Sequence, residues 1–277
     1  MIKVFVTPTG IFLESNGRYF RPDAPLDLDT IFTAPNPAEL VGRFLNGAGL
    51  TDPPPESELL APISRQEVWA AGVTYMRSKA ARMEEAKDTG GGDFYDRVYD
   101  AERPELFFKA TPQRVVGPGA EVRIRSDSNW NVPEPELTLA ISAGGRIFGY
   151  SIGNDMSSRD IEGQNPLYLA QAKIYAGSAA LGPCLVVSDE LPGPSTQIRI
   201  DIVRAGQSVF DGSTNIGQMK RSLQSLAEFL YRDNSFPFGA YLMTGTGIVP
   251  PDSFSLEHGD EIRITIDAVG TLSNAVA

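Results

Sequence analysis

Three acidic residues in one short stretch, Glu134, Glu136 and Asp155, have the types and spacing needed to bind a metal ion. Carboxylates brought close together repel one another unless a shared proton or a cation neutralises them. A hard divalent cation takes oxygen ligands, so carboxylate-only ligation favours Mg²⁺, with Mn²⁺ or Ca²⁺ as alternatives. In the competing interpretation, Glu134 and Glu136 face solvent on an edge strand, where the neighbouring prolines are tolerated. The spacing alone leaves both interpretations open.

A predicted β-hairpin is the element that must bring these side chains together. An alternating apolar run follows Glu136, and a Gly-Gly pair at 144–145 separates it from a second run. We expect two antiparallel strands joined by a two-residue turn. Counting back from this turn places Glu134 opposite Asp155, and Glu136 opposite Gly153. Because directly opposed residues project from the same face of a sheet, the three carboxylates converge.

The segment 104–110 reads as a buried strand that carries two charged residues, Glu105 and Lys109. Burying a charge is unfavourable unless the charge is paired or functional, so both residues are further candidates for a functional site. In the alternative interpretation, the two residues pair with each other or point to solvent.

Several motifs follow one another along the chain in a fixed order. They are Glu-x-Glu at 134–136, Gly-Tyr-Ser-Ile-Gly-Asn-Asp-Met-Ser-Ser-Arg-Asp at 149–160, Gln-Ala-Lys-Ile-Tyr at 171–175, Thr-Gly-Thr-Gly at 244–247 and Leu-Glu-His-Gly-Asp-Glu-Ile at 256–262. Over roughly residues 65–277, the sequence resembles the fumarylacetoacetate hydrolase superfamily. The resemblance implies an α+β, β-rich fold, a mixed β-roll or sandwich with peripheral helices, in which two Glu and one Asp hold Mg²⁺ or Ca²⁺. It also implies a homodimer or homotetramer. The polar and charged residues 79–102, with three glycines at 90–92, are compatible with a solvated helical pair or with a closing lid, and the resemblance favours the lid.

Hydrolytic members of this superfamily carry a water-activating histidine after a Gly-x-Asn-Tyr motif, and the present sequence differs from them there. Ser78 stands at that position, and the only histidine, His258, lies far away before the last predicted strand. Losing such a general base removes a contribution of about 10²- to 10⁴-fold, which disfavours hydrolysis. The sequence is similar to a branch without this histidine, the 2-keto-3-deoxy-D-arabinonate dehydratases of oxidative pentose catabolism. In that branch a lysine follows the Asp at the interval seen for Lys173.

The resemblance to this branch implies a metal-dependent hydro-lyase that converts 2-keto-3-deoxy-D-arabinonate (2-dehydro-3-deoxy-D-pentonate) to 2,5-dioxopentanoate. A 2-oxo sugar acid would chelate the cation held by the three carboxylates, and Lys173 would take a proton from C3. Glu105 is the second catalytic candidate. The candidates for binding the substrate are Tyr75, Arg77, Ser78, Gln171 and Thr246.

Two other functions are compatible with the same residues. An acylpyruvate or fumarylpyruvate-type C–C hydrolase, or an oxaloacetate decarboxylase, could use the same metal, with Glu105 in place of the missing histidine. A metabolite-binding protein without catalysis is the third function considered. Retention of all three acids together with Lys173 disfavours it.

The composition excludes several classes of partner. The 277 residues carry a formal net charge of −11, with no basic stripe of the kind that nucleic-acid-binding proteins need. An anionic substrate would therefore require a local cation to recruit it. No apolar segment suits a signal peptide or a membrane span, which predicts a cytoplasmic protein with no membrane partner. We expect a small N-terminal α+β domain at 1–60 and a catalytic domain at 61–277.

Overall fold

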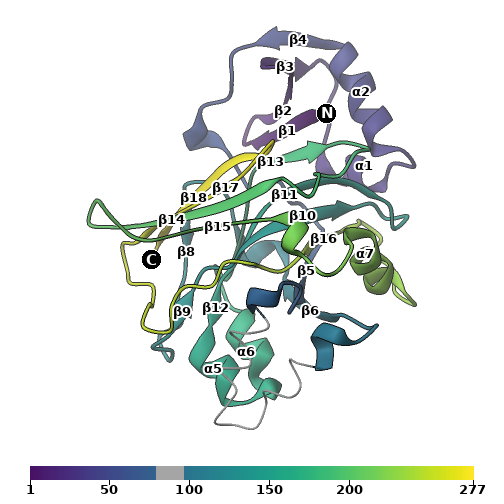
Figure 1. Ribbon diagram of the computed structural model, residues 1–277. Coiled ribbons are helices and arrows are strands. Elements are labelled where there is room, and N and C mark those ends of the chain that lie inside the picture. Colours follow the sequence, from purple (N-terminus) through teal and green to yellow (C-terminus); the bar gives the residue numbers. More distant parts are fainter. Residues whose placement is uncertain (79–96) are drawn as a thin grey trace.

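A computed structural model describes residues 1–78 and 97–277 of the chain (Figure 1). Two open β-sheets form most of it, and short helices lie at the periphery. The predicted α+β, β-rich fold is therefore confirmed. Most of the predicted lid falls on 79–96, outside the described residues. In the described ranges, no helix is long and apolar enough to cross a membrane.

The larger sheet contains eleven of the described strands. Its main path runs β4-β3-β2-β1-β13-β11-β10-β16-β5-β6, and β7 pairs with β13 beside that path. The strands are β1 (Ile2–Thr7), β2 (Gly10–Ser15), β3 (Arg18–Pro22), β4 (Ala48–Thr51), β5 (Glu67–Gly72), β6 (Glu105–Ala110), β7 (Val115–Val116), β10 (Pro135–Ile141), β11 (Ile147–Asp155), β13 (Ala179–Val187) and β16 (Ala240–Met243).

A five-stranded sheet in the order β15-β14-β17-β18-β8 packs against the larger one. Its strands are β8 (Glu121–Val122), β14 (Gln197–Arg204), β15 (Gln207–Asn215), β17 (Glu261–Ile266) and β18 (Gly270–Val276), and a further two-stranded sheet joins β9 (Asn131–Val132) and β12 (Ser157–Ser158). In β14 and β17, buried isoleucines alternate with residues that are not buried, as expected of strands with one face on the core. Ile200 and Ile264 of this sheet share one apolar cluster with Leu137 and Leu139 of β10.

The helices lie around the edges of the sheets (Figure 1). They are α1 (Leu28–Thr33), α2 (Pro37–Asn46), α5 (Arg159–Gln164), α6 (Leu169–Lys173) and α7 (Leu223–Tyr231), with 3₁₀ turns at Glu56–Glu58, Pro112–Arg114, Pro166–Tyr168 and Ile216–Gln218. Helix α2 begins where the Asn36 side chain accepts a hydrogen bond from the backbone N of Glu39, with Pro37 in its first turn. Helices α1 and α2 lie near the N-terminal strands, whereas α5 and α6 lie at the opposite end of the molecule.

Residues 1–60 continue the larger sheet. Strand β1 pairs antiparallel with β13, with Val4 opposite Leu185, so β1 to β4 extend the same hydrogen-bonded ladder. Phe32 of α1 packs edge-on against Phe148 of β11, with the ring centroids 4.8 Å apart. The division of the chain near residue 60 stays a prediction.

The β10–β11 hairpin has the register that the sequence predicts. Glu136 pairs with Gly153. One step further along, the backbone N of Asp155 donates to the carbonyl of Glu134 at 3.0 Å. Both glutamates and the aspartate therefore project from the same face of the hairpin.

The turn that sets this register differs from the predicted one. The backbone N of Ser142 donates to the carbonyl of Arg146 at 2.9 Å, so three residues rather than two form the loop. Gly145 adopts a φ of 80°, in the left-handed region that glycine enters without strain. A β-bulge between Ala140 and Ile141 then shifts the pairing by one residue. The two differences cancel, and the register at the carboxylates is unchanged.

Candidate metal and catalytic site

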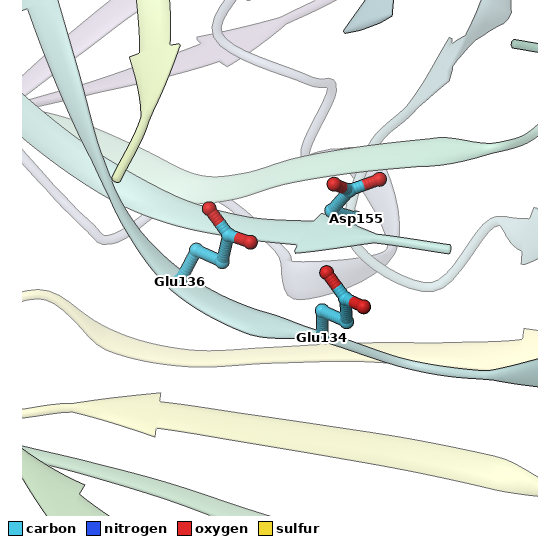
Figure 2. A group of neighbouring side chains, drawn as sticks. All are labelled: Glu134, Glu136 and Asp155. Atoms are coloured by element: carbon cyan, nitrogen blue, oxygen red, sulfur yellow. The ribbon is translucent and has the colours of Figure 1, made fainter. Parts of the chain in front are cut away.

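The hairpin brings three carboxylates to one point (Figure 2). Glu134 directly precedes β10, Glu136 is the second residue of β10, and Asp155 is the last residue of β11. One ligand oxygen from each lies within 4.8 Å of the others, and each residue is at most 4 % exposed. The predicted convergence is confirmed. The solvent-facing alternative is wrong because β10 lies between β11 and β16 inside the larger sheet.

Glu136 is held in an environment that disfavours its negative charge. Burial raises the pKa of its carboxyl group well above the usual range, and the neighbouring Asp155 and Glu134 raise it further. Within residues 1–78 and 97–277, its carboxylate accepts one hydrogen bond, from the backbone N of Gly245 at 2.6 Å, and forms no ion pair. A bound divalent cation would offset this unfavourable environment.

Lys173 is buried beside two of the three carboxylates. Its Nζ donates to Glu134 Oε2 at 2.8 Å, to Asp155 Oδ2 at 3.0 Å and to Ser157 Oγ at 2.5 Å. The residue ends helix α6 and is 1 % exposed. The structure thus places the predicted base next to the predicted metal ligands.

Lys109 of β6 is a second buried ammonium group at the site. Its Nζ lies 2.6 Å from Asp155 Oδ1, and it donates to the carbonyl of Met156 at 2.9 Å and to the carbonyl of Lys173. Burial lowers the pKa of Lys109, although the Asp155 carboxylate opposes that shift. Lys109 therefore neither points to solvent nor pairs with Glu105, and Asp155 is its partner.

Arg159 provides a third cation that sequence reasoning did not place here. It is 2 % exposed, and its Nη2 donates to Glu134 Oε1 at 2.8 Å. It reaches the site because it is the first residue of α5, which begins directly after β12. Each oxygen of Glu134 thus faces a different cation, Arg159 on one side and Lys173 on the other.

A small cavity lies beside these groups. Its free volume is about 20 Å³, roughly the room that one water molecule or metal ion takes. Glu105, Ser78 and Thr246, all predicted from the sequence, line it together with the carboxylates and Lys173. The lining residues that were not predicted are Ala71, Gly72, Val73, Phe107, Arg159, Glu162 and Gly245.

Three of the residues predicted to bind substrate do not line this cavity. Tyr75 and Arg77 border a separate, larger hollow. Burial, and after it the Glu136 carboxylate, raises the pKa of Tyr75, so the phenol lies within electrostatic reach of the site. Gln171 is exposed on α6, and its backbone carbonyl accepts a hydrogen bond from Arg125 at 3.2 Å.

The donor set fits a hard divalent cation. All three groups are carboxylates, which suit Mg²⁺, Mn²⁺ and Ca²⁺. They are buried and converge on a space large enough for one ion. Burial and the two neighbouring carboxylates raise the pKa of Glu136, and a cation bound between the three groups would oppose that shift.

Comparison with known proteins identifies the family. Residues 68–277 match the profile of the fumarylacetoacetate (FAA) hydrolase C-terminal domain. The chain belongs to the fumarylacetoacetate hydrolase family. Within that family, it is 46 % identical over 217 residues to a 2-dehydro-3-deoxy-D-arabinonate dehydratase from Saccharolobus solfataricus. It is 47 % identical over 216 residues to a probable 2-keto-3-deoxyxylonate dehydratase from Haloferax volcanii. Each match covers 78 % of this chain and 73 % of the relative.

A solved structure from the fumarylacetoacetate hydrolase family supports the fold over nearly the whole chain. It is a 2-keto-3-deoxy-D-arabinonate dehydratase complexed with magnesium and 2,5-dioxopentanoate. The match has a TM-score of 0.81 at 36 % identity and covers 99 % of this chain and 98 % of that one. The resemblance inferred from the motifs, to the family and to its dehydratase branch, is confirmed.

Proposed function

We propose that this protein is a Mg²⁺-dependent hydro-lyase that converts 2-keto-3-deoxy-D-arabinonate to 2,5-dioxopentanoate and water. The observation that carries the proposal is the buried group of three carboxylates with the Lys173 ammonium on two of them, in a chain 46 % identical to a dehydratase of this substrate. A related dehydratase binds magnesium and 2,5-dioxopentanoate. Among the described residues, no histidine lines the cavity, so C–C hydrolysis lacks its usual base.

The reaction needs one group to remove a proton and another to help a hydroxyl leave. Bound by the three carboxylates, Mg²⁺ would polarise the 2-oxo group of the substrate and acidify C3. Lys173 Nζ is buried against Glu134 and Asp155, two of the proposed ligands. With those carboxylates bound to the cation, the neutral amine of Lys173 would be the base that takes the C3 proton. Glu105 lines the same cavity and would donate the proton with which the C4 hydroxyl leaves as water.

Loss of the C3 proton and the C4 hydroxyl forms a double bond between C3 and C4. A proton then moves from C5 to C3, and the resulting C5 enol becomes the aldehyde of 2,5-dioxopentanoate. The same two residues, Lys173 and Glu105, are available for this transfer because both line the cavity. The carbon skeleton stays intact throughout, and no water nucleophile is required.

Binding of the remaining substrate groups is assigned to hydroxyl side chains at the cavity wall. Ser78 and Thr246 line the cavity, which supports their role in binding the hydroxyl or carboxylate groups of the sugar acid. Tyr75 and Arg77 border the separate larger hollow and would contact a substrate only from that side. Gln171 is exposed outside the cavity and has the weakest structural support of the five candidates.

We further propose that the enzyme acts in oxidative pentose catabolism in the cytoplasm, as a homodimer or homotetramer. The names of the two curated relatives, which specify 2-oxo-3-deoxy pentonates, support the pathway. The assembly follows from the resemblance to the family, and the location is the expectation drawn from the sequence.

Proton NMR with racemic 2-keto-3-deoxypentonate and Mg²⁺ tests the proposed reaction. We expect an aldehyde signal to grow until half of the racemate is consumed, because a chiral site selects one configuration at C4. An acylpyruvate in a parallel tube distinguishes the dehydratase from the hydrolase. Cleavage of the acylpyruvate without any aldehyde from the pentonate would refute the proposal and direct attention to Glu105 as a water-activating base.

A further inference from the structure

Gly72, the last residue of β5, faces Glu105, the first residue of β6, directly across the two strands. A Cβ atom built on Gly72 would lie 2.1 Å from Glu105 Oε2 and 2.6 Å from Glu105 Cδ. Nonbonded carbon and oxygen atoms do not approach so closely, because their attraction is optimal at about 3.5–4 Å. The carboxyl group of Glu105 thus occupies the space that any side chain at position 72 would take.

This placement directs the Glu105 side chain toward the cavity beside the three carboxylates. Directly opposed residues of antiparallel strands project from the same face, so a side chain at position 72 would compete with Glu105 for that face. Gly72 and Glu105 both line the cavity that contains the carboxylates and Lys173. Phe107, two positions along β6, lines it as well, which confirms that this face of β6 is the one turned to the site.

We propose that Gly72 is a positioning residue that admits the Glu105 carboxyl group into the cavity because it has no side chain of its own. The inference deepens the proposed function and rests on it, since it assigns the proton transfer at C4 to Glu105. According to this inference, the size of residue 72 decides whether the Glu105 carboxyl group can face the leaving hydroxyl. A larger residue at position 72 would leave the metal site intact and displace the acid.

The structure indicates that the protein would fold with alanine at this position. The φ of Gly72 lies outside the left-handed region, so an L-residue fits the backbone. The nearest atoms to the added Cβ all belong to the far part of the Glu105 side chain, which can rotate away. Gly72→Ala is therefore expected to move a carboxyl group and to leave the sheet unchanged.

A double-mutant cycle tests the coupling of the two residues. The variants are Gly72→Ala, Glu105→Gln and the two together, with kcat measured at saturating Mg²⁺ and Mg²⁺ affinity measured by calorimetry. We expect Gly72→Ala to lower kcat by about 10-fold or more, which is within the contribution of a general acid, while the affinity for Mg²⁺ stays within about 2-fold. Adding Glu105→Gln to Gly72→Ala should lower kcat no further.

Two further variants separate positioning from a general effect on the strand. Gly49→Ala in β4 is the matched control, because a Cβ at Gly49 meets no atom within 4 Å, and it should keep wild-type kcat. Glu105→Asp shortens the acid and frees the contested space. In that background, Gly72→Ala should change kcat by less than about 3-fold, whereas losses that simply multiply would overturn the proposal.

A crystal structure of the Gly72→Ala variant decides the placement without reference to activity. We expect the Glu105 carboxyl group to have left the cavity, and a carboxyl group still lining the cavity would overturn the inference. Failure of the wild type to dehydrate the pentonate would refute the proposed function, while the crystal structure still tests Gly72. Full turnover by Glu105→Gln would overturn the role of Glu105 and, with it, that of Gly72.

Discussion

Replacing Lys109 by methionine should destabilise the protein and slow its reaction, because the Lys109 ammonium joins three parts of the site. It is 0 % exposed and contacts the Asp155 carboxylate together with the backbone carbonyls of Met156 and Lys173. Methionine keeps most of the volume of the side chain but removes the charge and all three donors. Strand β6, which also carries Glu105, would lose its polar link to the metal hairpin.

The expected loss of stability follows from what remains at Asp155. Removing one partner of a buried ion pair costs about 3–5 kcal/mol. Lys173 still reaches Asp155 Oδ2 at 3.0 Å, so the carboxylate keeps one cation and the lower part of that range applies to the ion pair. The two buried carbonyls that lose a donor each add about 1 kcal/mol. We therefore expect the free energy of unfolding to fall by about 5 kcal/mol in total.

Urea unfolding in the presence of a chelator measures this loss, and coincident fluorescence and circular dichroism transitions justify the comparison. The matched control is Lys3→Met, which removes a partly buried lysine donor to the carbonyl of Val269 at 3.1 Å and should cost about 1 kcal/mol. At saturating Mg²⁺, Lys109→Met should also lower kcat by about 10- to 100-fold, since Asp155 loses the group that orients it. Equal destabilisation by the two variants, with kcat unchanged in both, would refute the role assigned to Lys109.

Three further predictions concern the carboxylates, the base and the buried thiol. Glu136→Gln should fold normally and lose Mg²⁺-dependent turnover, because a neutral amide replaces an anionic ligand; wild-type turnover would remove Glu136 from the ligand set. Lys173→Ala should bind Mg²⁺ in calorimetry but lose hydrogen–deuterium exchange at C3 of the substrate, and unchanged exchange would exclude Lys173 as the base. Burial raises the pKa of the Cys184 thiol to about 12, from an ordinary value of 9.0. As the pH rises, the thiol loses its proton at a lower pH in the unfolded chain than in the folded protein. The contribution of the Cys184 thiol to the free energy of unfolding is therefore complete below pH 9. It falls by about 1.4 kcal/mol per pH unit between pH 9 and about pH 12. The free energy of unfolding between pH 9 and pH 10 should therefore fall more steeply in the wild type than in Cys184→Ala, and parallel curves would contradict this.

The convergence of the acids could be predicted because it depends on local rules. Alternation with period two and the pairing of one hairpin place Glu134, Glu136 and Asp155 on one face, and the structure has that register. The turn was predicted one residue too short, because two adjacent glycines do not reveal which of them adopts a positive φ. The bulge at Ala140 compensated for the error, and no sequence rule predicts such a compensation.

The cations around the carboxylates could not be assigned to their partners from the sequence. Lys109 reaches Asp155 although β16 and β5 separate β6 from the hairpin in the order of the larger sheet, so the contact depends on a tertiary arrangement between segments far apart in the chain. One signal was available, since Glu105, Phe107 and Lys109 alternate and therefore share one face of β6. Gln171 was predicted to bind substrate because of its motif, but α6 turns its side chain outward while burying Lys173.

Anomalous diffraction from crystals soaked in Mn²⁺ tests the central claim most directly, because it locates the cation independently of any assay. We predict one strong anomalous peak within about 2 Å of carboxylate oxygens from Glu134, Glu136 and Asp155. The peak should disappear in crystals of the Glu136→Gln variant grown and soaked in the same way. An ion bound elsewhere in the wild type, with none between these carboxylates, would contradict the proposed metal site and the chemistry derived from it.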